Sequence, residues 1–448
     1  MKDFTQGKES KLIMRFALPM VVSSLFQNLY SIIDSIIVGN YIGKEALAAV
    51  GASFPIIFTL ISLVIGVGSG ASTVVSQFFG AKQYDNVKRT IDTIYVFFAA
   101  AGVLISIIGI YFAEDIFRLM ILPEELMPQA TTYLQTYLLG MALFFGFNGI
   151  TSVLRGMGDS KTPLWFMIIA VCANTILDLL FVIVFKWGIA GVAYATVIAH
   201  AGAFFTAAWY LNKTHKLVQF RIKQIQFNWK IFYSCVRIGL PTGFQQSFVA
   251  IGMMAIMGIV NGFGTNAVAA YTAAMRIDAF AKMPAMTFSS ALSSFAAQNL
   301  GAFQERRAKR GLRATLLISG GYCVLSTALI VLTGETLMRM FTSDQDVINI
   351  GIDYLVIVSS FYILFSIMFS FYGILRGAGA TLVPMLITVL SLWVLRIPLT
   401  YFLSQKIGVN GIFWALPASW LLGASASWFY YMTGKWKNKV IIKKEEVK

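Results

Sequence analysis

Two acidic residues lie deep inside long apolar runs, where carboxylates are rare. One of them, Asp34, ends a polar stripe. The other members of the stripe precede it at spacings of three and four residues and share one face of a helix: Gln27, Tyr30 and Ser31. The second acid, Asp178, follows Asn174 by four residues, so these two side chains share a face of another helix. Thr196 and His200 repeat this spacing in a third apolar run.

A carboxylate buried in a membrane is costly unless it is protonated, paired or coordinated. Neither Asp34 nor Asp178 has an evident basic partner in its half of the chain. A site for an exchangeable cation explains both acids. With the oxygens of Asn174 and Thr196 the set suits a hard ion such as sodium, and two close carboxylates also suit a shared proton. Both ions remain open at this point.

Each of these residues also has a purely structural interpretation. The two acids can form a protonated, helix-bound pair without a role in transport, although membrane carboxylates are functional by default. Asn174 and Thr196 can bond to neighbouring helices or to their own backbone. His200 either relays protons, lines a cavity or bonds to a neighbouring helix. Pro19 either bends the first apolar run or begins its regular helix.

The composition defines the class of protein that must position these residues. Hydrophobic residues make up 58% of the chain and charged residues 12%, far from the values of soluble domains. Continuous apolar runs exclude a β-barrel and predict an all-α integral membrane protein. We expect twelve transmembrane helices, near residues 12–38, 46–77, 91–112, 130–154, 163–185, 190–211, 231–260, 267–298, 312–332, 350–374, 383–404 and 409–432.

The net charge of +15 reflects membrane topology more than nucleic-acid binding, because the basic residues lie between the apolar runs. Connections on the side of the N-terminus carry 27 of the 35 Lys and Arg, and the opposite side carries 5. We therefore expect a multi-pass plasma-membrane protein with both termini in the cytoplasm and no nucleic-acid partner. The basic runs at 213–230, 306–313 and 435–448 serve topology and contact with anionic membrane lipid.

The two halves of the chain repeat at a nearly fixed offset, which indicates duplication. The domains expected from it are an N-terminal lobe (1–213), a cytoplasmic linker (214–230), a C-terminal lobe (231–434) and a basic tail (435–448). Six helices per lobe is an even number, so the lobes should be related by an axis along the membrane normal. The motifs that recur after 220 to 222 residues are Leu18-Pro19, Gln77 with Gly80-Ala81, Lys88-Arg89, Arg155-Gly-Met-Gly with Pro163, and Gly188 with Gly191.

Several remaining features have structural explanations. In the RGxGxxxxP element, Gly156 can take the left-handed helix cap and Pro163 suits the next helix start. Asp278 and Lys282 either pair across one helical turn or face a cavity, and Arg396 can reach the outer interface by extending its side chain. The role of Arg276 stays open. No convergent catalytic set, metal-binding spacing or cofactor motif is present in the sequence, so we expect no enzyme and no cofactor beyond a coupling ion.

The chain resembles the multidrug and toxic compound extrusion (MATE) family over nearly its whole length. The resemblance is carried by the twelve spans, the 221-residue duplication, Gly-Ala-Lys after the second span and RGxGxxxxP after the fourth and tenth. Gly188-x-x-Gly-x-Ala-x-Ala-Thr196 completes it. The likeness is to the subgroup with its coupling carboxylates in the N-terminal lobe alone. The C-terminal lobe lacks equivalents, because the repeat offset carries Asn174 to Leu395 and Asp178 to Leu399.

The resemblance implies export of cationic or amphipathic drugs by alternating access, in exchange for protons or sodium ions. It places the coupling ion, including a possible sodium ion, at Asp34, Asn174, Asp178 and Thr196. It places the substrate cavity along Pro19, Gln27 and Tyr30, and Ser31 and His200 join this cavity by sharing helix faces with the site. We expect a monomer. The alternative is a flippase for lipid-linked sugars, whose cavity would be rich in arginine and lysine, whereas this one is acidic.

Overall fold

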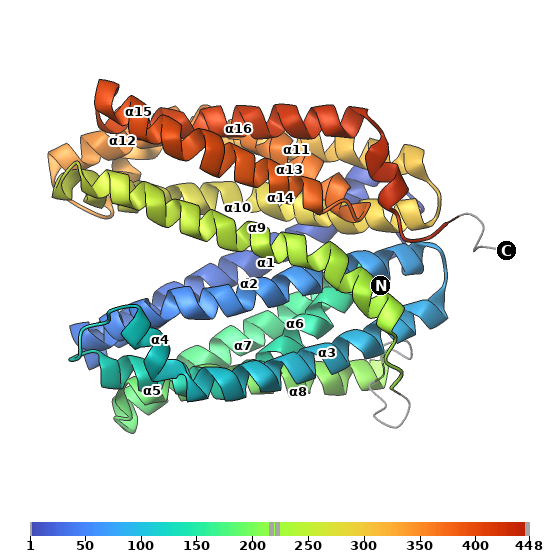
Figure 1. Cartoon of the computed structure of the whole chain (residues 1–448), viewed down its shortest axis with the longest axis horizontal. Helices are drawn as coiled ribbons and strands as arrows, with labels where there is room; N and C mark the ends of the chain where they lie inside the picture. Colours follow the sequence, from blue (N-terminus) through green and yellow to red (C-terminus); the bar gives the residue numbers. More distant parts are fainter. Residues whose placement is uncertain (1, 215–218, 220–224, 444–448) are drawn as a thin grey trace. The chain divides into compact units, whose positions relative to one another are not determined.

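The computed structural model describes residues 2–214, 219 and 225–443, and all regular elements among them are helices (Figure 1). Residues 215–218 and 220–224 of the expected linker (214–230) and residues 444–448 of the expected basic tail (435–448) lie outside the described residues. The elements are α1 (Glu9–Ile37), η1 (Val38–Ile42), α2 (Lys44–Gly80), α3 (Tyr84–Tyr111), α4 (Ala113–Leu119), α5 (Met127–Leu139), α6 (Met141–Gly156), α7 (Lys161–Leu179), η2 (Leu180–Val184), α8 (Gly188–Thr214), α9 (Trp229–Asn261), α10 (Thr265–Gly301), α11 (Glu305–Arg339), α12 (Gln345–Ser359), α13 (Tyr362–Gly377), α14 (Leu382–Val389), η5 (Leu390–Arg396), α15 (Ile397–Ile407), α16 (Val409–Met432) and η6 (Lys435–Lys439).

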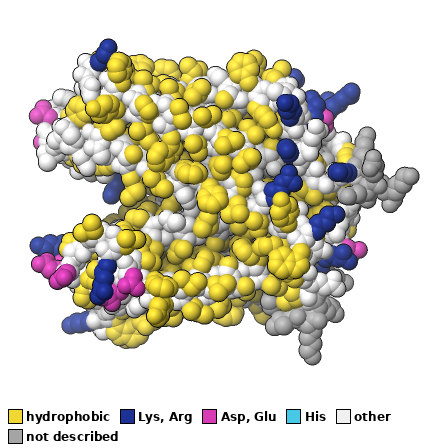
Figure 2. All heavy atoms as spheres, in the orientation of Figure 1, with side chains coloured by type: hydrophobic (Ala, Val, Ile, Leu, Met, Phe, Trp, Pro, Cys, Tyr) yellow, Lys and Arg dark blue, Asp and Glu magenta, His cyan; other side chains and the backbone are white. Residues whose placement is uncertain are grey.

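The twelve expected spans are all present as helices. Within the described ranges, nine segments are long and apolar enough to cross a membrane by themselves, and two more spans are bent helix pairs, α5–α6 and α12–α13. The twelfth is α10, a 37-residue helix in which Arg276, Asp278 and Lys282 dilute the apolar composition. On the face drawn in Figure 2, hydrophobic side chains cover the middle of the helices while Lys and Arg lie toward helix ends. This distribution is typical of a membrane-spanning protein.

Two spans expected as continuous helices are bent by 49°. In the fourth span the bend lies at Gly140, between α5 and α6, and in the tenth it lies at Ser360, between α12 and α13. At Gly140, a Cβ atom would come within 2.8 Å of the Val197 side chain, so the glycine lets α8 pack closely against the bend. Hydropathy alone does not reveal such a break, because the apolar run continues through it.

Three spans carry a short π-helical segment beside a charged residue. Segment η1 begins four residues after Asp34, η2 begins two residues after Asp178, and η5 ends at Arg396. A π-helical turn leaves the usual backbone ladder and is often found at functional sites. Both acids of the candidate cation site therefore lie next to a local irregularity of their own helix.

The RGxGxxxxP elements end α6 and α13 with a glycine in the left-handed conformation, but at a different position from the one expected. Gly158 and Gly379 have φ values of 79° and 86°, whereas Gly156 remains in α6. The expectation that Gly156 forms the cap is therefore wrong. Its role is close packing against α2, because a Cβ atom on Gly156 would lie 2.8 Å from the Ser72 carbonyl oxygen. The Gly156 carbonyl also accepts a 2.8 Å hydrogen bond from Ser76 Oγ of α2. Pro163 is the third residue of α7, as expected for a helix start.

The helices form two compact units. One holds residues 22–79 and 83–239 with Lys2, and the other holds 3–21, 80–82 and 240–443 of the described chain. Both α1 and α9 pass from one unit to the other, next to Pro19 and Pro241 respectively. Because α1 begins at Glu9, Pro19 is internal to the helix, and the interpretation of Pro19 as a helix start is wrong.

Small residues join α9 to α2 in the first unit. Gly66 and Gly70 of α2 lie against Gly239 and Cys235 of α9, with each pair four residues apart. A Cβ on Gly239 would lie 2.6 Å from the Gly66 carbonyl oxygen, so the two backbones are in direct contact. This is the close helix–helix packing that small residues at a spacing of four allow in membranes.

In the second unit, both chain ends pack on the same end of the helices. Phe4 and Trp436 are fully buried in one apolar cluster, and the Phe4 N–H donates to Gln298 Oε1 at 3.0 Å. Lys437 reaches Glu305, at the start of α11, with a 2.7 Å ion pair. The described N-terminal and C-terminal segments therefore lie at the same end of this unit.

Candidate functional site

Asn174, Asp178 and Thr196 meet between α7 and α8 and are almost fully buried, each at most 2% exposed. Asn174 links the other two. With the amide turned so that both of its ends are satisfied, its side-chain nitrogen donates to Asp178 Oδ2 at 2.8 Å and its oxygen accepts from the Thr196 N–H at 3.2 Å. The four-residue spacing that predicted a shared face on α7 thus places the amide and the carboxylate in contact, and the Asp178 carboxylate is held in a defined orientation.

The first span brings Tyr30 and Asp34 to the same place. The Tyr30 hydroxyl lies 3.1 Å from Thr196 Oγ1, which joins α1 to α8. Asp34 lies one turn further along α1, close enough to Asp178 for the two charges to interact. The structure therefore brings together side chains from three spans, α1, α7 and α8, and all four members of the expected cation set lie in this cluster.

Two tyrosines of α5 complete the surroundings, and the sequence did not single them out. Tyr133 and Tyr137 are four residues apart, and each lies within electrostatic range of Asp34. One signal was available, because the 221-residue offset carries Tyr133 to Tyr354, another buried tyrosine. Phenol hydroxyls can both donate to a carboxylate and accept, so they suit a site whose charge changes.

The chemistry of the cluster follows from its unsatisfied oxygens. Asp34 Oδ1 and Asp178 Oδ1 are buried and have no hydrogen-bond partner among the described residues. No lysine or arginine of the described chain forms an ion pair with either acid. A buried oxygen of this kind is costly unless something binds to it. Protons or a hard monovalent cation would satisfy both oxygens, since oxygen ligands are what such ions prefer.

The residues expected to line the substrate cavity differ from one another in exposure and in their contacts. Gln27 and Ser31 are exposed on α1. The Ser31 hydroxyl donates to the backbone carbonyl of Gln27, one turn earlier in the same helix. Pro19 belongs to the other unit, eight residues before Gln27. His200 lies one turn beyond Thr196, with its Nδ1 buried and without a partner in the described structure. Its ring packs edge-on against Phe144 at 4.8 Å, so packing with α6 is its closest described interaction.

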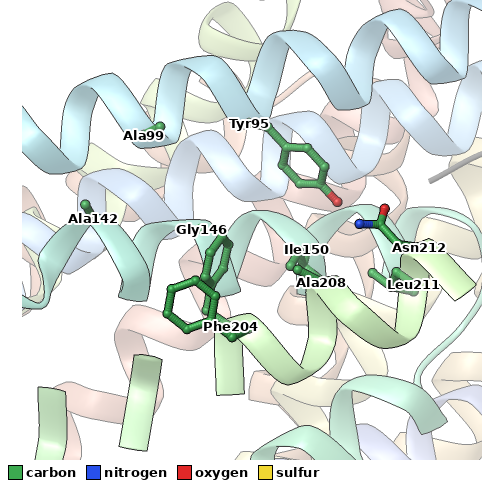
Figure 3. A pocket seen from close by; sticks show the side chains of 10 residues that line it. Tyr95, Ala99, Ala142, Gly146, Ile150, Phe204, Ala208, Leu211 and Asn212 are labelled. Atoms are coloured by element: carbon green, nitrogen blue, oxygen red, sulfur yellow. The ribbon is translucent and has the colours of Figure 1, made fainter. Parts of the chain in front are cut away.

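An apolar pocket of about 220 Å³ lies elsewhere in the same unit, between α3, α6 and α8 (Figure 3). Phe204 and Gly146 line its middle, and the side chains of Tyr95 and Asn212 point toward one another at one end. None of the acidic cluster lines this pocket. The candidate cation site is therefore a set of buried side chains and not part of this cavity.

The duplication is matched by comparison with known proteins. The MatE family model matches residues 19–180 and 241–402, which are most of the two halves. The chain belongs to the MatE family. Members of this family are transporters, so the chain is a multi-pass membrane transporter of twelve helices in two six-helix lobes, and not an enzyme.

Relatives from this family cover the chain from end to end. The probable multidrug resistance protein YpnP of Bacillus subtilis is 35% identical over 97% of this chain and 97% of its own length. The FAD transporter of Shewanella oneidensis is 27% identical over 94% and 93% of the two chains. A solved outward-facing multidrug resistance MATE family transporter superposes with a TM-score of 0.92 at 23% identity, covering 98% and 99%, and supports the MatE fold.

Proposed function

We propose that this MatE transporter is a multidrug efflux antiporter that exports cationic or amphipathic organic compounds in exchange for protons or sodium ions. The observation that carries the proposal is the pair Asp34 and Asp178, each with one buried, unpartnered carboxylate oxygen and neither in an ion pair within the described residues. A multidrug resistance protein among the relatives supports the substrate class. The FAD transporter is a relative with an anionic substrate, which two carboxylates would repel.

The exchange follows from the charge of the cluster. When the coupling ion occupies the two carboxylates, the negative charge of the pair is reduced and a cationic drug is bound less strongly there. When the ion leaves toward the cytoplasm, the restored charge attracts the drug. Linkage requires that ion and drug weaken each other's binding by the same factor. Asn174, itself bonded to Thr196, holds the Asp178 carboxylate in position, and Tyr30 and the α5 tyrosines supply hydroxyls that adapt to either charge state.

The cavity and topology assignments support the same proposal. We place Gln27, Tyr30 and Ser31 along the drug path because they share the face of α1 that ends at Asp34. His200, one turn from Thr196, lines the same path. Both chain ends pack on one end of the second unit, and with the excess of Lys and Arg on that side they favour a plasma-membrane protein with cytoplasmic termini. We expect it to act as a monomer.

The experiment that tests the proposal is ethidium export in proteoliposomes with a proton gradient or a sodium gradient imposed separately. The unmutated protein should export the dye under one of the two gradients. Asp34→Asn and Asp178→Asn should each abolish export, because they keep the shape and remove the charge. Asp115→Asn, an exposed carboxylate of α4, is the matched control and should export normally. Full export by both of the first two variants would refute the site.

A further inference from the structure

Another buried acid lies in the C-terminal unit, and it differs from Asp34 and Asp178 in having its own cation. Asp278 and Lys282 of α10 form an ion pair, with Oδ2 and Nζ 2.6 Å apart. Their side chains are 3% and 19% exposed. The pair across one helical turn is the arrangement that the sequence spacing allows, and the structure shows how it is surrounded.

Two tyrosines complete the coordination of the carboxylate. The Tyr362 hydroxyl donates to Asp278 Oδ1 at 2.8 Å, and the Tyr354 hydroxyl donates to Oδ2 at 3.1 Å. Both tyrosines are 1% exposed. Asp278 thus has partners on both carboxylate oxygens, in contrast to Asp34 and Asp178, each of which has an unpartnered oxygen.

Aromatic rings surround the ammonium group. Lys282 Nζ lies 5.4 Å from the centre of the Phe365 ring and 5.3 Å from that of Trp420. A ring face attracts a cation within about 6 Å, and aromatic cages of this kind recognise ammonium ligands. A carboxylate on one side and two rings on the others therefore form a box for an ammonium ion, defined by Asp278, Tyr354, Tyr362, Phe365 and Trp420. The occupant is a side chain of the same helix.

The box is not a copy of the N-terminal site. The repeat offset carries Asp278 back to Ile57 and Lys282 back to Ile61, while Tyr354 corresponds to Tyr133 beside Asp34. Each unit therefore has a buried tyrosine beside a carboxylate, but in one the carboxylates lack a cation and in the other a lysine supplies it. A plain ion pair needs no aromatic cage, and an apolar pair could replace it at little cost.

We propose that Lys282 is a tethered cation that fills an ammonium-binding box in the C-terminal lobe and keeps exchangeable cations out of it. When the Lys282 side chain is removed, the empty box should bind a primary alkylammonium ion. Exclusion by Lys282 confines ion exchange to the N-terminal acids, and this consequence rests on the proposed antiport. The affinity of the box for an ammonium ion does not rest on it.

The test removes the lysine and returns its cation as a free molecule. Lys282→Ala deletes the side chain beyond Cβ, and n-propylammonium has the shape of the deleted part. Thermal unfolding of the purified full chain should show a lower Tm for Lys282→Ala, and n-propylammonium chloride should raise it in a saturable way, by a few degrees. Equal concentrations of sodium chloride or of n-propanol should not raise the Tm of Lys282→Ala.

Three matched variants make the result specific. Asp278→Asn with Lys282→Ala lacks the carboxylate and should show no rise, and Lys282→Met fills the box with an uncharged chain and should show none either. The third carries Asp34→Asn and Asp178→Asn. In this background n-propylammonium should raise the Tm only when Lys282 is also replaced by Ala, which tests exclusion without any transport assay.

Equal rises with and without the Asp278 carboxylate, or no rise in Lys282→Ala, would overturn the proposal. If Lys282→Ala folds poorly, it should be recovered when n-propylammonium is present during purification. Failure to recover it with the amine, while Asp278→Asn with Lys282→Ala folds, also counts against the box. If the unmutated protein shows no antiport while n-propylammonium still raises the Tm of Lys282→Ala, the proposed function is refuted and the proposal for the box stands.

Discussion

Removing one charge from the N-terminal cluster should weaken the binding of a cationic dye by a definite amount. In Asp178→Asn, the amide keeps the size of the side chain but the unpartnered, buried Oδ1 no longer carries charge. A hydrogen bond or contact with a charged group contributes roughly 1.5–3 kcal/mol. This corresponds to about a 10- to 150-fold increase in the Kd of the dye.

The assay is equilibrium binding of ethidium to purified protein, followed by fluorescence at low sodium and high pH, where the coupling ion competes least. Asp34→Asn should show an effect of similar size, because its Oδ1 is also buried without a partner in the described structure. The double variant should lose less than the sum of the two, since both acids belong to one network. The exposed Asp115→Asn serves as the control. A change of less than about twofold in the Kd of ethidium in both single variants would refute the direct role of the acids in binding the cation.

Two further predictions concern the scaffold and the topology. Gly239→Ala should lower the Tm, because its Cβ would lie 2.6 Å from backbone atoms of α2 and such overpacking costs about 1–3 kcal/mol. Gly320→Ala, where a Cβ meets no atom within 4 Å, is the control, and an equal or larger loss there would contradict the packing argument. A cysteine at the exposed Lys435 should react with a membrane-impermeant thiol reagent only from the cytoplasmic side, and labelling of intact cells would contradict the orientation.

The sequence predicted the spans well because each is a long apolar run with polar ends. The first predicted helix, 12–38, is found as α1 and η1, and the last, 409–432, coincides with α16. The bends at Gly140 and Ser360 were not predicted, since they depend on packing against other helices and leave no gap in hydropathy. The short helix α4 was missed for a related reason, because seven residues between two spans are too few for a periodic pattern.

The candidate site was predicted in its members but not in its contacts. Spacing along one helix correctly paired Asn174 with Asp178, because residues four apart on a helix are neighbours. Spacing could not show that Tyr30 meets Thr196 across 166 residues, or that Tyr133 lies near Asp34. Contacts between helices depend on how the helices pack, which one sequence does not specify.

Arg396 illustrates the same limit in the C-terminal unit. The expectation that its side chain extends to the outer interface is wrong, since the residue is only 9% exposed. It ends the π-helical segment η5 and lies within electrostatic range of Tyr271 and Tyr354. A charged residue eight positions before the end of its predicted span, 383–404, gives the same sequence pattern whether it extends outward or packs inward.

The central claim is obligatory exchange at Asp34 and Asp178, and the most direct test is to run the exchange backwards. Proteoliposomes are loaded with ethidium, diluted into dye-free buffer without any imposed ion gradient, and followed for internal pH and for uptake of radioactive sodium. Antiport predicts that the outward dye gradient alone drives protons or sodium inward, and that Asp34→Asn with Asp178→Asn abolishes this ion movement. Dye efflux through the unmutated protein with no accompanying movement of either ion would contradict the account.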